Sequence, residues 1–130
     1  MTHEWRDHTA EVELQLEAAN EGTLFAEAAA AFGEYVERSS GGEPARHEVA
    51  LEARDRASLL VELLEELIYL ADTEGFVTDR GLLVLDGPRL TGTLEGRRTE
   101  IAPIVKAATY HDLAYERRGE AWHAHVVLDV

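Results

Sequence analysis

The sequence predicts an α+β two-layer sandwich in which two helices cover one face of a largely antiparallel sheet. Two segments repeat apolar residues at helical spacing, and most of the remaining chain alternates apolar and polar residues as strands do. The elements follow in the order β-α-β-α-β-β-β-β, and such a run of strands after the helices is typical of this class. With 130 residues, of which 45% are hydrophobic, the chain can bury one core, so we expect a single domain over residues 1–130.

The first strand is predicted over residues 9–19, where Val12, Leu14 and Leu16 alternate with acidic and amide side chains. A turn follows at residues 20–22, and Thr23 is the expected N-cap of a helix. The helix continues to Val36, because its apolar residues return every three or four positions.

The second strand is predicted over residues 47–53 and is followed by a helix capped by Asp55 or Ser58. This helix has a wide apolar face and a narrower solvent-exposed face, which contains Glu62, Glu65, Glu66 and Tyr69. So much apolar surface requires a sheet to cover it. Gly75 is the natural residue to end the helix.

The rest of the chain is predicted to be strands, at residues 76–78, 82–85, 89–94, 105–117 and 121–130. Turns are expected at residues 79–81, 86–88 and 118–120, and residues 99–104 are expected to form a loop. Strict alternation along 105–117 predicts that one of Tyr110 and His111 faces the core and the other faces solvent.

The charge is strongly acidic, with 26 Asp and Glu against 12 Lys and Arg and a net charge of −14. Such a surface repels the phosphates of nucleic acid, so we expect no direct nucleic-acid binding. It suits metal ions or a basic protein partner, although solubility or adaptation to salt or heat would give the same composition. The chain has no cysteine, no apolar run that could span a membrane and no apolar opening stretch, so we expect a cytoplasmic protein.

Carboxylates stand at both ends of the chain beside apolar, strand-like sequence. If the first and last strands are neighbours, Glu11, Asp129 and the terminal carboxylate of Val130 gather at one edge of the sheet. Oxygen ligands of this kind suit a hard cation such as Ca²⁺ or Mg²⁺. The alternative is that Asp129 is a solvated acid at a fraying end.

Histidines offer two further arrangements. His123 and His125 lie at i, i+2 on one face of a predicted strand and could bind a transition metal. Asp7 and His8 could form an acid-oriented imidazole, as in a general base. No nucleophile stands at a spacing that completes a triad, so we predict no catalytic residue.

Four phrases, taken together and in order, resemble the archease family over almost the whole chain. They are Asp7-His8-Thr9-Ala10-Glu11, Leu59-Leu60-Val61-Glu62-Leu63-Leu64, Lys106-Ala107-Ala108-Thr109-Tyr110-His111 and Leu128-Asp129-Val130. The resemblance implies a non-enzymatic protein cofactor of an RtcB-type RNA ligase, which joins RNA ends in tRNA splicing and RNA repair. Such a cofactor promotes guanylylation of the ligase and repeated turnover.

The resemblance also implies a metal site made by Glu11, Asp129 and Val130. The family usually has Asp where this chain has Glu11, whose carboxylate reaches one methylene further. Ca²⁺ tolerates this change better than Mg²⁺ because its coordination shell is more flexible, so we favour Ca²⁺. Two alternatives remain, a small metal-dependent hydrolase and a metal-independent chaperone or adaptor.

Overall fold

The computed structural model describes residues 1–8, 10–36, 41–100 and 105–130, without the side chains of Asp7 and His8. It confirms the α+β class, with two helices and seven strands over the described residues. The helices are α1 (Glu21–Val36) and α2 (Arg56–Glu74). The strands are β1 (Thr2–His8), β2 (Glu11–Ala18), β3 (Glu43–Glu52), β4 (Phe76–Asp86), β5 (Arg89–Arg98), β6 (Ala107–Arg118) and β7 (Ala121–Asp129).

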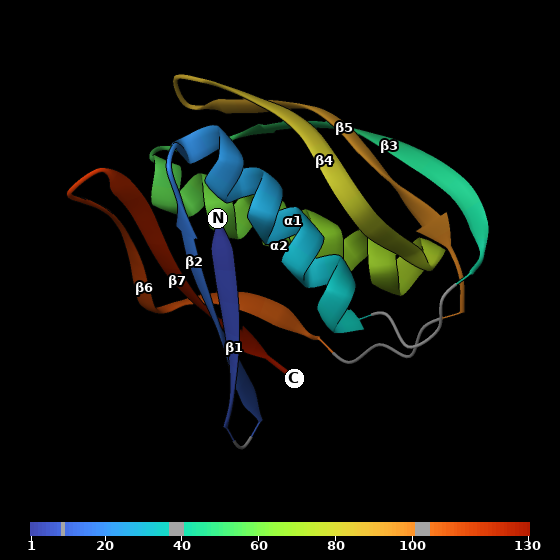
Figure 1. The fold of residues 1–130 in the computed structure, drawn as a ribbon. Helices are drawn as coiled ribbons and strands as arrows, with labels where there is room; N and C mark the ends of the chain where they lie inside the picture. Colours follow the sequence, from blue (N-terminus) through green and yellow to red (C-terminus); the bar gives the residue numbers. More distant parts are fainter. Residues whose placement is uncertain (9, 37–40, 101–104) are drawn as a thin grey trace.

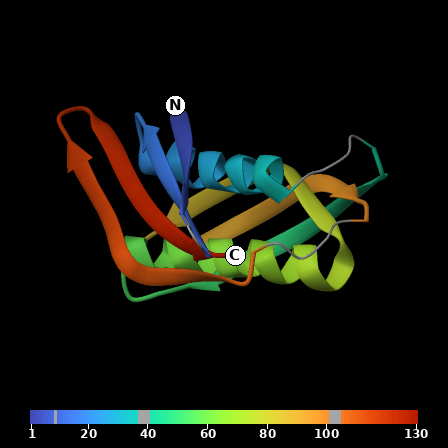
Figure 2. The same ribbon diagram turned by 90° about the horizontal axis from the view of Figure 1, so that it is seen from below.

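The strands form two sheets, where the sequence predicted one. All pairings are antiparallel, in the orders β1-β2-β7-β6 and β3-β5-β4. The last hairpin, β6–β7, pairs with β2 and so leaves the central strands as a separate sheet (Figure 1). Both helices contact strands of both sheets and thereby join them in one core (Figures 1 and 2).

Strand β1 was not predicted, because its only apolar side chain within Thr2–His8 is that of Trp5. The strand is fixed to α1 by side chains. Trp5 stacks on Tyr35 with ring centroids 4.4 Å apart. The His3 ring lies 2.9 Å from the Glu27 carboxylate and 3.2 Å from that of Glu34. Burial alone would lower the pKa of His3, but the hydrogen bonds and charges of these two carboxylates outweigh burial and raise the pKa above 6.5.

The helix ends are largely as predicted. Asp55 is the N-cap of α2 and accepts a hydrogen bond from the Ser58 N–H at 2.7 Å. Gly75 ends this helix in a left-handed conformation with φ of 65°. The prediction for α1 was wrong by three residues, since Asn20 is the residue whose side chain accepts the Thr23 N–H, at 2.8 Å.

The turn predicted at residues 79–81 is absent, and β4 runs without interruption from Phe76 to Asp86. A register shift between Thr78 and Arg80 accommodates the charged residues there. Arg80 contacts Glu95 of the neighbouring strand β5, and Asp79 accepts hydrogen bonds from Arg97. These polar residues therefore form a β-bulge on a solvent-exposed surface and do not reverse the chain.

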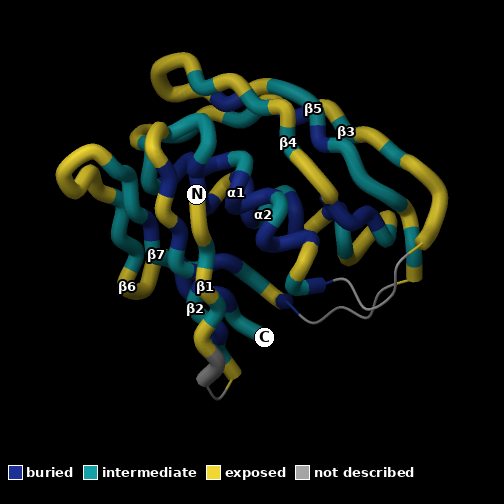
Figure 3. Tube along the Cα trace, in the orientation of Figure 1, coloured by how far each residue is buried: buried dark blue, intermediate teal, exposed yellow. Residues whose placement is uncertain are grey.

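The buried residues lie mainly along the helices and on the strand faces turned toward them (Figure 3). Helix α1 meets β4 at Gly33, where a Cβ atom would stand 1.8 Å from the Thr78 carbonyl oxygen. The missing side chain thus allows helix and strand backbones to touch. In the described residues, neither helix is long and apolar enough to cross a membrane.

Candidate metal site

Glu11 and Asp129 are direct partners across the antiparallel pair of β2 and β7. Val12, Leu14 and Leu16 of β2 are buried on the core face, so Glu11 belongs to the opposite face. Opposed residues share a face, and Asp129 therefore stands on the same outer face. The first strand expected from the sequence and the last strand are therefore neighbours, which is the condition for the carboxylates to gather at one edge.

The backbone hydrogen bonds show how close the two side chains lie. The Val130 N–H donates to the Ala10 carbonyl at 3.1 Å, so these two residues belong to a hydrogen-bonded position of the ladder. The next pair, Glu11 and Asp129, is then a non-hydrogen-bonded pair, in which Cα atoms are about 4.5 Å apart and side chains are closest. Both residues are half-buried.

Neither carboxylate has an ion-pair or hydrogen-bond partner among the side chains that the structure describes. Two unneutralised acids in direct opposition repel each other. A cation between them would remove this repulsion, and its chemistry would be that of a hard ion bound by oxygen. Two side chains provide only part of the six to eight oxygens that Ca²⁺ takes, so water or the α-carboxylate of Val130 would have to supply the rest.

The hairpin between β1 and β2 brings Glu11 to this position through a strained residue. Ala10 has φ of 63°, which is unusual for a residue other than glycine. Its carbonyl holds Val130, so the backbone at the end of β7 is tied to the turn. Thr9 and the side chains of Asp7 and His8, including the predicted acid–imidazole pair, lie outside the described residues.

Strand β6 lies beside β7 on the side away from β2, and Glu65, which the sequence did not single out, holds it in place. Lys106 N–H donates to the Asp129 carbonyl at 2.8 Å. The Ala108 N–H donates to the Glu65 carboxylate of α2, also at 2.8 Å. Glu65 was predicted to be solvated, and no pattern in the sequence indicates that it fixes an edge strand.

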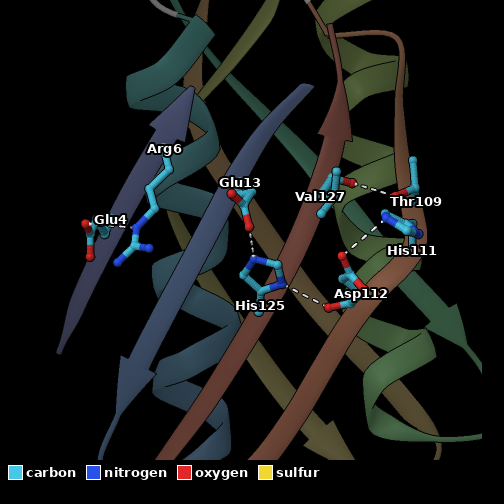
Figure 4. A network of polar contacts seen from close by, with 8 residues as sticks. All are labelled: Glu4, Arg6, Glu13, Thr109, His111, Asp112, His125 and Val127. Carbon is cyan, nitrogen blue, oxygen red and sulfur yellow. Dashed lines mark hydrogen bonds and ion pairs between the residues drawn. The ribbon is translucent and has the colours of Figure 1, made fainter. Parts of the chain in front are cut away.

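A polar network on the same face lies one step further from the pair (Figure 4). The ring of His125 contacts the Glu13 carboxylate at 2.6 Å and the Asp112 carbonyl at 2.9 Å. Thr109 donates to the Val127 carbonyl at 3.0 Å. The network fixes an irregular part of β6 to the neighbouring strands.

This irregularity corrects the prediction for Tyr110 and His111. The β6–β7 register shifts between Thr109 and Ala114, and Asp112 has a positive φ of 53°. Alternation fails there, so Tyr110 is 52% exposed and the His111 side chain 70% exposed. Neither faces the core.

The histidine pair does not form the predicted transition-metal site. His123 and His125 share the outer face, but both ring nitrogens of His125 are already engaged. Within the described part of the chain, no group of three or more His, Cys, Asp or Glu side chains is placed to hold a metal ion. Glu11 and Asp129 are only two side chains and so do not make up a group of three.

The fold and this site define a small acidic α+β protein in which carboxylates from the β2 and β7 strands meet on one sheet face. A model of the archease protein family matches residues 3–130, and the chain belongs to this family. Protein archease of Archaeoglobus fulgidus is 32% identical over 137 residues, covering 100% of both chains. Protein archease of Pyrobaculum neutrophilum is 31% identical over 139 residues, covering 98% of this chain and 95% of the relative.

Two solved structures have the same fold. Protein 1598 of Methanobacterium thermoautotrophicum has a TM-score of 0.73 and 31% identity, over 98% of each chain. A protein of Thermotoga maritima, described as an archease and possible chaperone, has a TM-score of 0.71 over 100% of this chain and 98% of its own. Its identity of 21% supports the fold alone.

Proposed function

We propose that this protein is a non-enzymatic activator of an RtcB-type RNA ligase in the cytoplasm, promoting guanylylation and repeated turnover in tRNA splicing and RNA repair. Membership of the archease family is the basis for the partner. The observation that supports a specific mechanism is the direct opposition of Glu11 and Asp129 on one sheet face.

We further propose that Glu11, Asp129 and the α-carboxylate of Val130 bind a divalent cation, Ca²⁺ in preference to Mg²⁺. The donor set fits, because all three groups supply hard oxygen ligands and two of them lack a described side-chain partner. The cation would supply positive charge at an otherwise acidic surface. The chain's own residues would fix the position of that charge, since Val130 is tied to Ala10 and the end of β7 to β6.

The contacts of His125 give no support to hydrolysis by a histidine-activated nucleophile among the described residues. One ring nitrogen of His125 contacts the Glu13 carboxylate and the other contacts the Asp112 carbonyl. Neither nitrogen is therefore left to activate a nucleophile among the described residues. The acidic surface would approach the basic side of a ligase rather than RNA.

The test is multiple-turnover joining of a 3′-phosphate RNA to a 5′-hydroxyl RNA by an RtcB-type ligase from the same source. We expect a large rise in turnover with this protein and no joining by this protein alone. Asp129→Asn should abolish most of the rise. Asp86→Asn is the matched control, because Asp86 is an exposed acid that opposes Arg89 on the other sheet.

Each outcome separates the two parts of the proposal. If the unchanged protein gives no rise, the accessory role is wrong. If Asp129→Asn retains the full rise, the metal site has no part in activation and a metal-independent adaptor remains. Calorimetry with CaCl₂ tests Val130 directly, since a C-terminal extension should weaken binding and an N-terminal one should not.

A further inference from the structure

The outer face of the four-stranded sheet contains a groove that the candidate metal site does not use. Its volume is about 690 Å³. It lies toward the start of β1 and the β6–β7 hairpin, and Glu17 on β2 is six residues from Glu11, or about 20 Å along the strand. The residues that line the groove include Glu17, Ala114, Glu116, Arg118, His123 and His125.

The strand register explains the shape of the groove. Glu17, His123 and Glu116 stand opposite one another on β2, β7 and β6, so they form one row across the sheet. The next row contains Gln15, His125 and Ala114. Ala114, whose side chain is a single methyl group, and Glu116 both line the groove.

The first row has the chemistry of a guanidinium site. His123 lies on β7, between Glu17 on β2 and Glu116 on β6, and its side chain is 27% exposed. An imidazole is a planar group of the kind on which a guanidinium stacks. The carboxylates on each side can accept its N–H groups, as Arg prefers. Glu17 lies 3.8 Å from His123, so it is only loosely engaged.

The chain's own Arg118 demonstrates this chemistry at the rim. Its guanidinium forms an ion pair with Glu116, while Arg118 and Glu116 remain 66% and 48% exposed. An exposed pair of this kind contributes little stability and exchanges readily for another partner. Arg118 therefore competes with any incoming cation for Glu116.

We propose that this groove binds an arginine side chain on an extended segment of a partner protein, with the guanidinium over His123 and between Glu17 and Glu116. Charge complementarity identifies the occupant, since the outer face also carries Glu4 and Glu13 and the whole chain has a net charge of −14. The inference is independent of the ligase and of the metal site.

The experiment is an NMR titration of ¹⁵N-labelled protein with acetyl-Gly-Arg-Gly-amide. We expect shifts centred on Glu17, Glu116 and His123, and binding about threefold weaker for the lysine analogue. Glu116→Gln should weaken binding by about threefold, and Arg118→Ala should strengthen it by about as much.

The matched controls are Glu52→Gln and Arg89→Ala. Glu52 and Arg89 also form an exposed ion pair between strands, at 3.6 Å, on the other sheet. Each control changes the net charge as its counterpart does and should leave affinity unchanged. Equal effects of the two sets would overturn the proposal, because binding would then follow net charge alone. A single-stranded RNA that binds these residues more tightly than the peptide would also overturn it.

Discussion

Replacing Gly33 by alanine puts two opposing effects in competition. In an exposed helix, Gly→Ala stabilises by about 1 kcal/mol because alanine loses less conformational entropy. At Gly33 the new Cβ atom would lie 1.8 Å from the Thr78 carbonyl oxygen and 2.9 Å from its carbon. Since Cβ contacts below 3.0 Å essentially never occur, α1 and β4 would have to separate by about 1.2 Å, the difference between 3.0 and 1.8 Å.

The clash should win. Overpacking costs about 1–3 kcal/mol, and the upper end applies here because the opposing atom is backbone and cannot rotate away. After the gain in helix propensity, we expect Gly33→Ala to lower the free energy of unfolding by about 2 kcal/mol. For a chain of this length, that corresponds to a fall in Tm of about 8 °C.

Urea denaturation measures the difference, and Gly22→Ala is the control in the same helix. The closest atom to a Cβ at Gly22 is the Asn20 side-chain oxygen at 3.5 Å, an ordinary contact. This variant should be as stable as the unchanged protein or slightly more stable. If Gly33→Ala proved equally harmless, the close backbone packing of α1 on β4 would be refuted.

Two further predictions concern the attachments of the edge strands. The pKa of His3 is raised in the folded state, so its ion pairs with Glu27 and Glu34 contribute fully below its ordinary pKa of 6.5 and are lost as pH rises through the folded pKa. His3→Gln should therefore lower the urea midpoint more at about pH 5.5 than at about pH 8.5. His111→Gln is the control, because the His111 side chain is exposed, and its effect on the midpoint should not differ in this way between the two pH values. An equal loss from His3→Gln at both pH values would contradict the role of the charge. Glu65→Ala leaves the Ala108 N–H without its acceptor and should lower the free energy of unfolding by about 1–2 kcal/mol. Amide hydrogen exchange at Ala108 should become faster, and unchanged exchange would show that the hydrogen bond does not hold β6.

The sequence predicted the elements that carry a strong periodic signal. Helix α2 was predicted with its cap at Asp55 or Ser58 and its end at Gly75, because apolar periodicity and end residues agree there, and the structure selects Asp55. Strand β1 was missed because it is polar and depends on tertiary contacts such as the Trp5–Tyr35 stack. The turn at residues 79–81 was wrong because Asp, Arg and Gly suit a bulge as well as a turn.

The candidate site divides in the same way. Glu11 and Asp129 could be singled out as candidates from the sequence, since each lies beside apolar, strand-like residues. Glu65 could not, because its role depends on where an edge strand far along the chain places one N–H group. The exposure of Tyr110 and His111 was also hidden, since the sequence carries no signal for the left-handed Asp112.

The position of the carboxylate pair is determined by hydrophobic burial. A slip of one residue between β2 and β7 would exchange the two faces of the slipped strand. It would expose Val12, Leu14 and Leu16, which are at most 3% exposed, and would turn Glu11 and Glu13 into the core. Burial of three such side chains is worth several kcal/mol, at about 1.5–3 kcal/mol each, and a buried unpaired carboxylate costs more. The apolar residues of β2 and β7 thus hold Glu11 opposite Asp129 whether or not a cation is bound. In the metal site proposed above, a variant of either acid should change Ca²⁺ affinity without changing the register.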